Sequence, residues 1–255
     1  MKKITLIILL TQFAFQFCFS QTIPDKGLVA YYTFNGEVKD ESGKNNNPVF
    51  NNITLTEDRF GNKNAAAYFN GKDNYIQIKS NSSLCPEEIT LVAIVKPMGF
   101  YNGNCYNNTI IDKGYRDYLP GAYALRYTAG EYTHGDCNDG DIAHQNFVGM
   151  VSDNGGKTSG DNYVKLNTWY YVVFTYNRQY CRLYLDGEMI SSYGSRSKIG
   201  KTNEDVFFGK KDNSNYPYWF NGVMDEIRIY DRCLTSEEVY TLHAQLSQSK
   251  PTASQ

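Results

Sequence analysis

The sequence lacks a strong charge of either sign. Its 255 residues include 25 basic and 27 acidic side chains, which give a formal net charge of −2. Such a balance provides no electrostatic field that would attract nucleic acid or anionic lipid over the whole molecule. We therefore expect no nucleic-acid partner.

Long apolar runs are absent after the first twenty residues. These residues combine Lys2 and Lys3 with a mostly apolar stretch, Ile4–Phe19, and a small residue, Ser20, as a secretory signal peptide does. We expect cleavage near Ser20 and a secreted or periplasmic protein, and a lipoprotein anchor at Cys18 is the alternative. No other stretch predicts insertion into a membrane.

Motifs for metal binding, nucleophilic catalysis and nucleotide binding are missing as well. The sequence has no Cys-x-x-Cys, Gly-x-Ser-x-Gly or His-Glu-x-x-His motif, and its three histidines are scattered. Gly-Lys-Thr occurs at 156–158 and 200–202 without the earlier glycine that a phosphate-binding loop needs. We expect turns at both places.

The chain instead contains many short segments that alternate apolar and polar residues between turns. In one of them, Ile89, Leu91, Ala93 and Val95 share a face, as a half-buried strand requires. The predicted strands are Leu28–Phe34, Ala65–Phe69, Tyr75–Ile78, Ile89–Val95, Thr109–Asp112, Ala122–Tyr127, Phe147–Val151, Trp169–Tyr176, Arg182–Leu185, Val206–Phe208 and Val223–Tyr230. This series predicts an all-β antiparallel sandwich or barrel.

Two local signals are strong. Asp186-Gly187 lies between two apolar runs and predicts a two-residue hairpin turn. Thr235 and Glu238 form a capping box before apolar residues at helical spacing, which predicts one short C-terminal helix. We divide the chain into a signal peptide (1–20), one domain (21–246) and a flexible tail (247–255).

The segment Phe220–Val239 carries five carboxylates. Asp225 and Glu226 are adjacent in a predicted strand, so we expect Asp225 to point inward and Glu226 to point outward beside Arg228. Two carboxyl groups that cooperate in glycoside hydrolysis must face the same site. The spacing therefore indicates structural roles and predicts a non-catalytic protein, with a divergent polysaccharide hydrolase or lyase as a less favoured hypothesis.

Seven segments occur in the order and spacing of a known family. They are GLVAYYTFNGEVKDESGKNNN, AAAYFNGKDNYIQI, EITLVAIVKP, TIIDKG, LNTWYYVVFTY, RLYLDGEMI and FNGVMDEIRIYDRCLTSEEV. The chain resembles the laminin-G-like, concanavalin A-like lectin/glucanase superfamily, in particular its bacterial secreted modules. The resemblance implies a two-sheet antiparallel jelly roll in which the first and last strands are neighbours and Ile89–Val95 pairs with Val223–Tyr230.

The resemblance also implies a pattern of disulfide bonds. The pairing of those two strands would place Cys85 near Cys233, and a bond there would clamp the two halves of the domain together. Cys105 and Cys137 lie in inserted loops and would form the second pair. Cys181 would remain unpaired.

Domains of this kind often bind calcium near their loops. The resemblance implies that Asp40, Asn45, Asn47 and Asp225 could supply oxygen ligands, because the first and last strands should be adjacent. The alternative is that Asp40 stabilises a turn and Asp225 is a hydrogen-bonded, half-buried acid. We carry calcium as a candidate cofactor.

Sugar recognition needs flat aromatic faces with amide or carboxylate groups at their edge. The insertions offer Tyr101, Asn102, Tyr106, Tyr115, Asp117, Tyr118 and Tyr132, and Tyr216, Tyr218 and Trp219 precede the last strand. Packing within the sheets and loops is the alternative role for each of them. We expect a secreted carbohydrate-binding or adhesion-type module, with a structural or protein-interaction module for an extracellular partner as the alternative.

Overall fold

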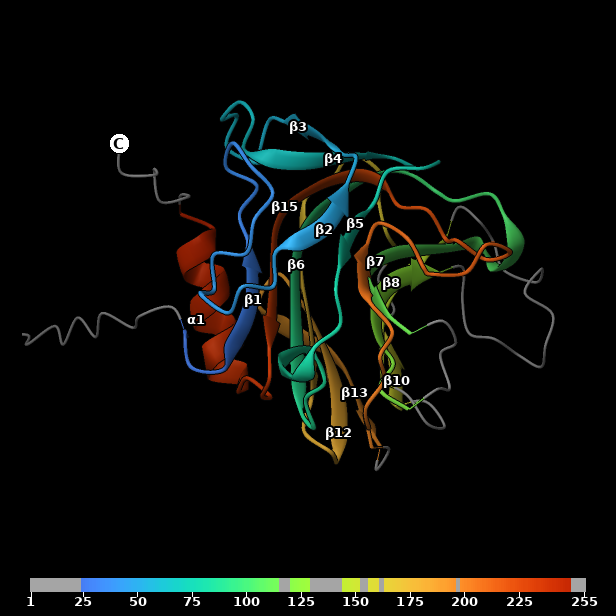
Figure 1. Cartoon of the computed structure of the whole chain (residues 1–255). Coiled ribbons are helices and arrows are strands. Elements are labelled where there is room, and N and C mark those ends of the chain that lie inside the picture. The colour runs from blue at the N-terminus through green and yellow to red at the C-terminus, as the bar shows by residue number, and fades with distance from the viewer. Residues whose placement is uncertain are drawn as a thin grey trace, which may run out of the picture.

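The domain is a sandwich of two antiparallel β-sheets. A computed structural model describes residues 24–114, 120–128, 144–151, 156–160, 163–195 and 198–248. The predicted signal peptide and residues 249–255 of the predicted tail lie outside these ranges. Figure 1 shows the two layers of strands side by side, with helix α1 (Ser236–Leu246) against one of them.

The first sheet, sheet A, has eight described strands. Its order is β13 (Glu188–Gly194), β12 (Tyr180–Leu185), β11 (Tyr170–Tyr176), β6 (Ile89–Gly99), β15 (Asn221–Tyr230), β4 (Ala66–Asn70) and β3 (Thr54–Thr56), and β1 (Leu28–Tyr32) also pairs with β15. The pairing of β6 with β15 and of β1 with β15 confirms what the family resemblance implies.

The second sheet, sheet B, has seven described strands. Its order is β10 (Gly156–Ser159), β9 (Asn146–Val151), β8 (Tyr123–Thr128), β7 (Asn107–Lys113), β14 (Val206–Phe208), β5 (Ile76–Ile78) and β2 (Pro48–Asn51). Two 3-10 turns, η1 (Ser82–Leu84) and η2 (Asn104–Tyr106), lie in the connections.

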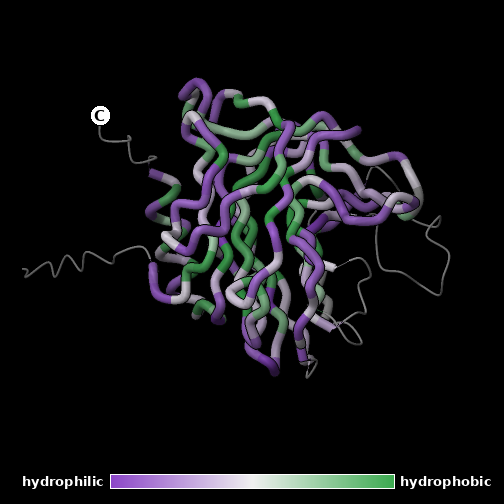
Figure 2. Tube along the Cα trace, viewed as in Figure 1, coloured by the Kyte–Doolittle hydropathy of each residue, from purple (hydrophilic) through white to green (hydrophobic). Residues whose placement is uncertain are grey.

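The main core lies between the inner faces of the two sheets. Ile89, Leu91, Ala93 and Val95 of β6 are fully buried there, which confirms the predicted alternation. A second apolar cluster lies on the outer face of sheet A, where α1 packs on alternate residues of β6 and β11. Strand β6 is therefore apolar on both faces, and Figure 2 shows hydrophobic residues concentrated in the middle of the sandwich.

All eleven predicted strands are present, and the described residues add four more, β2, β3, β10 and β13. Asp186 and Gly187 have φ angles of 49° and 86°, as a hairpin turn of the expected type requires. Thr235 and Glu238 form the predicted capping box at the start of α1. The prediction of a turn at 156–158 was wrong, because these residues pair with β9 as edge strand β10.

The prediction that Asp225 points into the core was also wrong. A β-bulge between Met224 and Glu226 inserts Asp225 as an extra residue opposite β6, so strict alternation fails at this point. The Asp225 carboxylate forms an ion pair with the guanidinium of Arg59, which also donates to the Leu246 carbonyl oxygen of α1 at 2.7 Å. Asp225 therefore lies on the side of sheet A that carries α1.

Glu226 lies beside Arg228, as the sequence indicates. The Arg228 Nε donates to Glu226 Oε1 at 2.6 Å, and the guanidinium carbon lies 4.0 Å from the centre of the Tyr31 ring. Both side chains are almost completely buried on the outer side of sheet A, the side that α1 packs against. Burial there also raises the pKa of the neighbouring Tyr31 hydroxyl. The two carboxylates of β15 thus bind different arginines and do not share a site.

The expected disulfide between Cys85 and Cys233 is absent, because both cysteines are free. The Cys85 thiol contacts the Thr202 carbonyl oxygen at 3.4 Å, in the chain that leads to sheet B. The Cys233 thiol instead donates to the Leu234 carbonyl oxygen at 3.5 Å, in the turn between β15 and α1. The two thiols therefore bond to different segments of the chain.

The remaining cysteines agree with the expectation as far as the structure describes them. Cys181 is free and lies in the core between the sheets. Cys105 is disulfide-bonded, but Cys137 lies outside the described residues, so the pairing of these two stays a prediction. Among the described helices, none has both the length and the apolar character needed to cross a membrane.

Replacing Arg59 by Met should lower the free energy of unfolding by about 3 kcal/mol, because a buried carboxylate then loses a cationic partner. Chemical denaturation of the full chain measures this loss. The double variant R59M/D225N removes the charge of the acid and should recover a large part of it. Equal stability of R59M and the unchanged protein would contradict the role given to this ion pair.

Alkylation with iodoacetamide in denaturant, without reductant, should modify Cys85, Cys181 and Cys233, because all three thiols are free. Peptide mass spectrometry identifies the modified residues. A peptide that links Cys85 to Cys233 would show that the assignment of free thiols is wrong.

Candidate functional site

The chain between β14 and β15 forms a folded loop at one end of sheet B. The Lys211 backbone N–H donates to the Pro217 carbonyl oxygen at 2.7 Å, and the Phe220 N–H donates to the Gly209 carbonyl oxygen at 2.9 Å. The Thr109 N–H of β7 donates to the Tyr218 carbonyl oxygen at 2.8 Å. These bonds fix the loop against sheet B and position its tyrosines.

Tyr218 is the centre of a group of aromatic and basic side chains, which we call the Tyr218 cluster. Its ring centre lies 6.3 Å from that of Tyr101 and 6.2 Å from that of Tyr216. The Arg126 guanidinium and the Lys211 ammonium lie 5.8 Å and 5.5 Å from the same ring centre. Tyr218 is almost buried, whereas 39% of Tyr216 is exposed and can meet a ligand.

A polar strip runs along the outer face of β7 and β8 beside this cluster. It consists of Asn107, Thr109, Asp112, Arg126 and Thr128, which alternate with core residues such as Leu125 and Tyr127. Arg126 Nη2 lies 3.3 Å from Asp112 Oδ2. The Thr109 hydroxyl has no hydrogen-bond partner in the described part of the chain. All five side chains are at most 3% exposed, so the strip is covered and supports the Tyr218 cluster from beneath.

Tyr101 is held between the strip and the cluster. Its backbone N–H donates to the Asn108 side-chain oxygen at 2.7 Å. Burial raises the pKa of Tyr101, so its hydroxyl stays protonated at neutral pH and can both donate and accept a hydrogen bond. The exposed part of the aromatic wall provides the flat faces that sugar recognition needs, and Asn102 beside it offers an exposed amide.

Trp219 belongs to a different group, although it follows Tyr218 directly. The Lys210 ammonium lies 4.5 Å from the ring centre of Tyr75, 4.7 Å from that of Phe207 and 6.0 Å from that of Trp219. These rings form an aromatic cage around a lysine of the same chain, which is a cation–π arrangement. The structure therefore separates Trp219 from Tyr101 and Tyr216.

The other predicted sugar-binding residues divide into two sets. Asn102 is exposed next to Tyr101, and Tyr106 is half-buried at the end of η2, with a positive φ angle of 43°. Tyr115, Asp117, Tyr118 and Tyr132 lie outside the described residues, so their roles stay predictions.

The carboxylate of Asp40, one of the predicted calcium ligands, accepts hydrogen bonds from backbone N–H groups. Asp40 Oδ1 accepts from the N–H groups of Tyr31 and Ser42, and Asp40 Oδ2 accepts from the Asn46 N–H. The Asn47 side-chain oxygen accepts from the Asp40 N–H at 2.9 Å, so this residue also closes the loop. Asp40 thus stabilises a turn with its own backbone, which was the alternative that the sequence offered.

Asp225 does not fit a calcium site shared with that loop. The Arg59 guanidinium occupies its carboxylate, and a cation at this position competes with calcium for the same oxygen atoms. Asn45 is exposed in the left-handed conformation, with a φ angle of 59°. Among the described residues, no group of three or more His, Cys, Asp or Glu side chains is placed to hold a metal ion.

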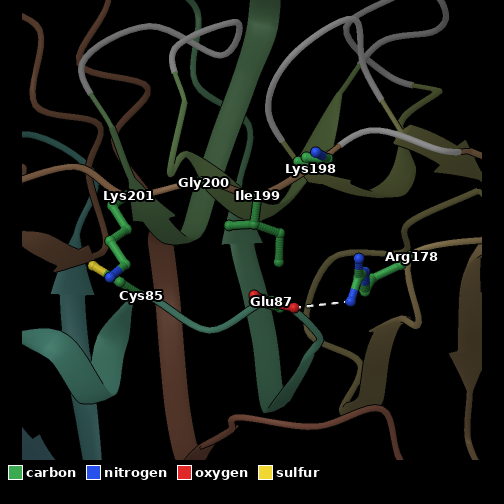
Figure 3. Close-up of a pocket in the computed structure, with 7 residues that line it drawn as sticks. All are labelled: Cys85, Glu87, Arg178, Lys198, Ile199, Gly200 and Lys201. Carbon is green, nitrogen blue, oxygen red and sulfur yellow. Dashed lines mark hydrogen bonds and ion pairs between the residues drawn. The ribbon is translucent and has the colours of Figure 1, made fainter.

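A hollow of about 190 Å³ lies between Cys85 and residues 198–201, the segment that leads to strand β14 of sheet B. Figure 3 shows Lys201 beside Cys85 and the ion pair between Glu87 and Arg178 below Ile199. The ion pair measures 2.8 Å, and both side chains are exposed, so its contribution to stability is small. One paired acid and a thiol without a histidine base do not make a catalytic group.

Sequence reasoning missed the residues that link the tyrosines to the sheet. The sequence places Arg126, Asp112 and Thr109 in predicted strands and does not mark them as site residues. A signal is nevertheless present in β8, because Arg126 and Thr128 alternate there with Leu125 and Tyr127, as on a face that meets solvent. Their burial shows that this face is covered.

Comparison with solved structures shows which proteins share this arrangement of strands. Domain 4 of AbnA, a GH43 extracellular arabinanase from Geobacillus stearothermophilus, was solved in complex with arabinotriose; it has a TM-score of 0.62 and 17% identity, over 85% of this chain and 98% of that one. The binding domain of Paraclostridial Mosquitocidal Protein 1 has a TM-score of 0.65 and 19% identity, over 88% of this chain and 53% of that one.

A third similar structure is the binding domain of botulinum neurotoxin DC in complex with SialylT. Its TM-score is 0.60 at 13% identity, over 87% of this chain and 52% of that one. The chain thus spans about half the length of the toxin binding domains it matches. Identities this low show a shared fold and nothing more.

Sequence comparison identifies the family. No curated protein matches the sequence. A family model described as the concanavalin A-like lectin/glucanases superfamily matches residues 69–240, which is more than half of the chain and includes β5 to β15. The chain therefore belongs to the concanavalin A-like lectin/glucanases superfamily.

Proposed function

We propose that this protein is a secreted, non-catalytic carbohydrate-binding module and that the exposed side of the Tyr218 cluster, which the buried polar strip supports, is its sugar site. The observation that carries the proposal is the Tyr218 cluster itself, in which Tyr101 and Tyr216 flank Tyr218 and Tyr216 is 39% exposed. The exposed rings would lie against the C–H face of a sugar, and the exposed Asn102 amide would bond its hydroxyl groups. The strip beneath is buried and supports the rings through the contact of Arg126 with Tyr218.

The similar structures support this class of ligand. The arabinanase domain was solved in complex with arabinotriose, and one of the neurotoxin binding domains was solved in complex with SialylT. The first of these domains is part of a hydrolytic enzyme. A hydrolase or lyase has less support for this chain, because Asp225 and Glu226 each bind an arginine.

A protein-interaction role is the second candidate. The β12–β13 hairpin at the edge of sheet A exposes Tyr180, Met189 and Tyr193 to 44%, 51% and 55%. Exposed aromatic and methionine side chains on an edge strand are typical of protein contacts. Pull-down of a stable extracellular partner that is lost on replacing Tyr193 would favour this function.

Replacing Tyr216 by Ala should weaken sugar binding about tenfold, which is a loss of about 1.4 kcal/mol in binding free energy. The reason is that the exposed stacking ring is lost while the buried part of the site stays intact. Isothermal titration with arabinan oligosaccharides, sialylated glycans and plant polysaccharides measures the affinity. Tyr240, which is 58% exposed on α1, provides the matched control as Y240A.

The titrations should be repeated with calcium and with EDTA. Loss of binding in EDTA would support calcium binding by the loop that contains Asp40, Asn45 and Asn47, and unchanged binding would count against it. Equal affinities of Y216A and Y240A would contradict the proposed site, and no binding to any glycan would contradict the function.

A further inference from the structure

A second hollow, of about 260 Å³, lies on the outer side of sheet A. Its walls come from the turn at Arg59 and Phe60, the start of β11 at Trp169, the β12–β13 turn and the last turn of α1. We call it the Trp169 pocket. The Tyr218 cluster lies on the outer face of the other sheet, and the shared core separates the two.

The walls of the Trp169 pocket are fixed by interactions between distant parts of the chain. Arg59 joins its turn to the end of α1 through the Leu246 carbonyl oxygen and to β15 through Asp225. A Cβ atom on Gly187 would lie 2.7 Å from His243 Nδ1, so glycine allows the hairpin turn to approach α1. The pocket is therefore formed before any ligand arrives.

Flat rings and polar groups line this pocket together. Trp169 and Phe60 are both partly exposed, and Tyr171 packs against the His243 ring with 5.1 Å between the ring centres. The Asp186 Oδ1 accepts from the Tyr171 N–H at 3.0 Å, and its exposed carboxylate lies at the rim. An aromatic floor with a few fixed acceptors is the usual chemistry of a small-molecule site.

The charges around the pocket select among possible ligands. The Arg59 guanidinium lies 4.4 Å from the ring centre of Phe60, and the Lys96 ammonium lies 5.0 Å from that of Trp169. Both rings already face a cation, so a cationic ligand would meet charge repulsion. An anionic ligand would be attracted by these two cations and repelled by the Asp186 carboxylate. A neutral polyol with one apolar face meets neither repulsion and matches both the rings and the polar rim.

We infer that the Trp169 pocket binds a single neutral sugar residue, stacked on Trp169 or Phe60 and hydrogen-bonded to Asp186. The volume lies just below the range of about 300–1,000 Å³ that drug-sized ligands need, so it suits one ring and not a long chain. This site is separate from the proposed sugar site on sheet B and does not depend on it. A protein with both would present sugar sites on opposite faces.

The two tryptophans of the chain allow each face to be observed separately. Trp169 lines the pocket, Trp219 lies with Phe207 of sheet B in the aromatic cage around Lys210, and the sequence contains no third tryptophan. In the full-chain variant W219F, the methyl glycosides of glucose, galactose, mannose, xylose, arabinose and N-acetylglucosamine should be titrated while Trp169 emission is recorded. At least one should give a saturable change.

Replacing Asp186 by Asn should weaken that response about tenfold, because a hydrogen bond to a charged acceptor is lost. Asn-Gly also favours the same hairpin turn, so D186N should leave the unfolding midpoint unchanged. In the reciprocal variant W169F, Trp219 is the remaining tryptophan, and its emission reports binding on the side of sheet B. No response to any glycoside in folded W219F would overturn the inference, and so would a saturable response to tetramethylammonium in their place. A response in W219F together with no glycan effect of Y216A would leave this site standing and reject the proposed function.

Discussion

Backbone hydrogen bonding along β15 joins parts of the chain that lie far apart in sequence. One edge of β15 pairs with β1 along Ile227–Tyr230 and with β4 along Asn221–Met224, and the other edge pairs with β6. Strand β15 therefore cannot be placed until the residues near both ends of the domain are close together. Pairing at this separation is slow to form, so we expect β15 to dock late in folding.

The bulge in β15 decides how the outer face of sheet A is built. It turns Asp225 toward Arg59, and Arg59 then anchors both the Phe60 turn and the end of α1. Glu226 and Arg228 remain on the same side as a buried pair beneath the helix layer. The acids that suggest chemistry in the sequence thus shape a surface, because each is neutralised where it lies.

The sequence predicts the strands, the hairpin, the helix cap and the family because each depends on local pattern. It fails where an inserted residue breaks the alternation, as at Asp225, although the residues after the bulge still lie on the predicted faces. It also fails where two segments were assumed to converge, as at Cys85 and Cys233. The candidate site is harder to predict than the fold. Arg126 and Thr109 become part of it only because Tyr218, from a loop much later in the sequence, packs onto their strands. Alternation gives the face of a residue and not what will cover it.

The burial of Cys181 between the sheets has a consequence for studying this molecule. Burial raises the pKa of its thiol to about 12, so very little of the reactive thiolate exists at neutral pH. Cys85 and Cys233 are only half-buried, so a reagent can reach them while the domain stays folded. Cys181 reacts only when the sandwich opens, and its rate of modification therefore measures how often the two sheets separate.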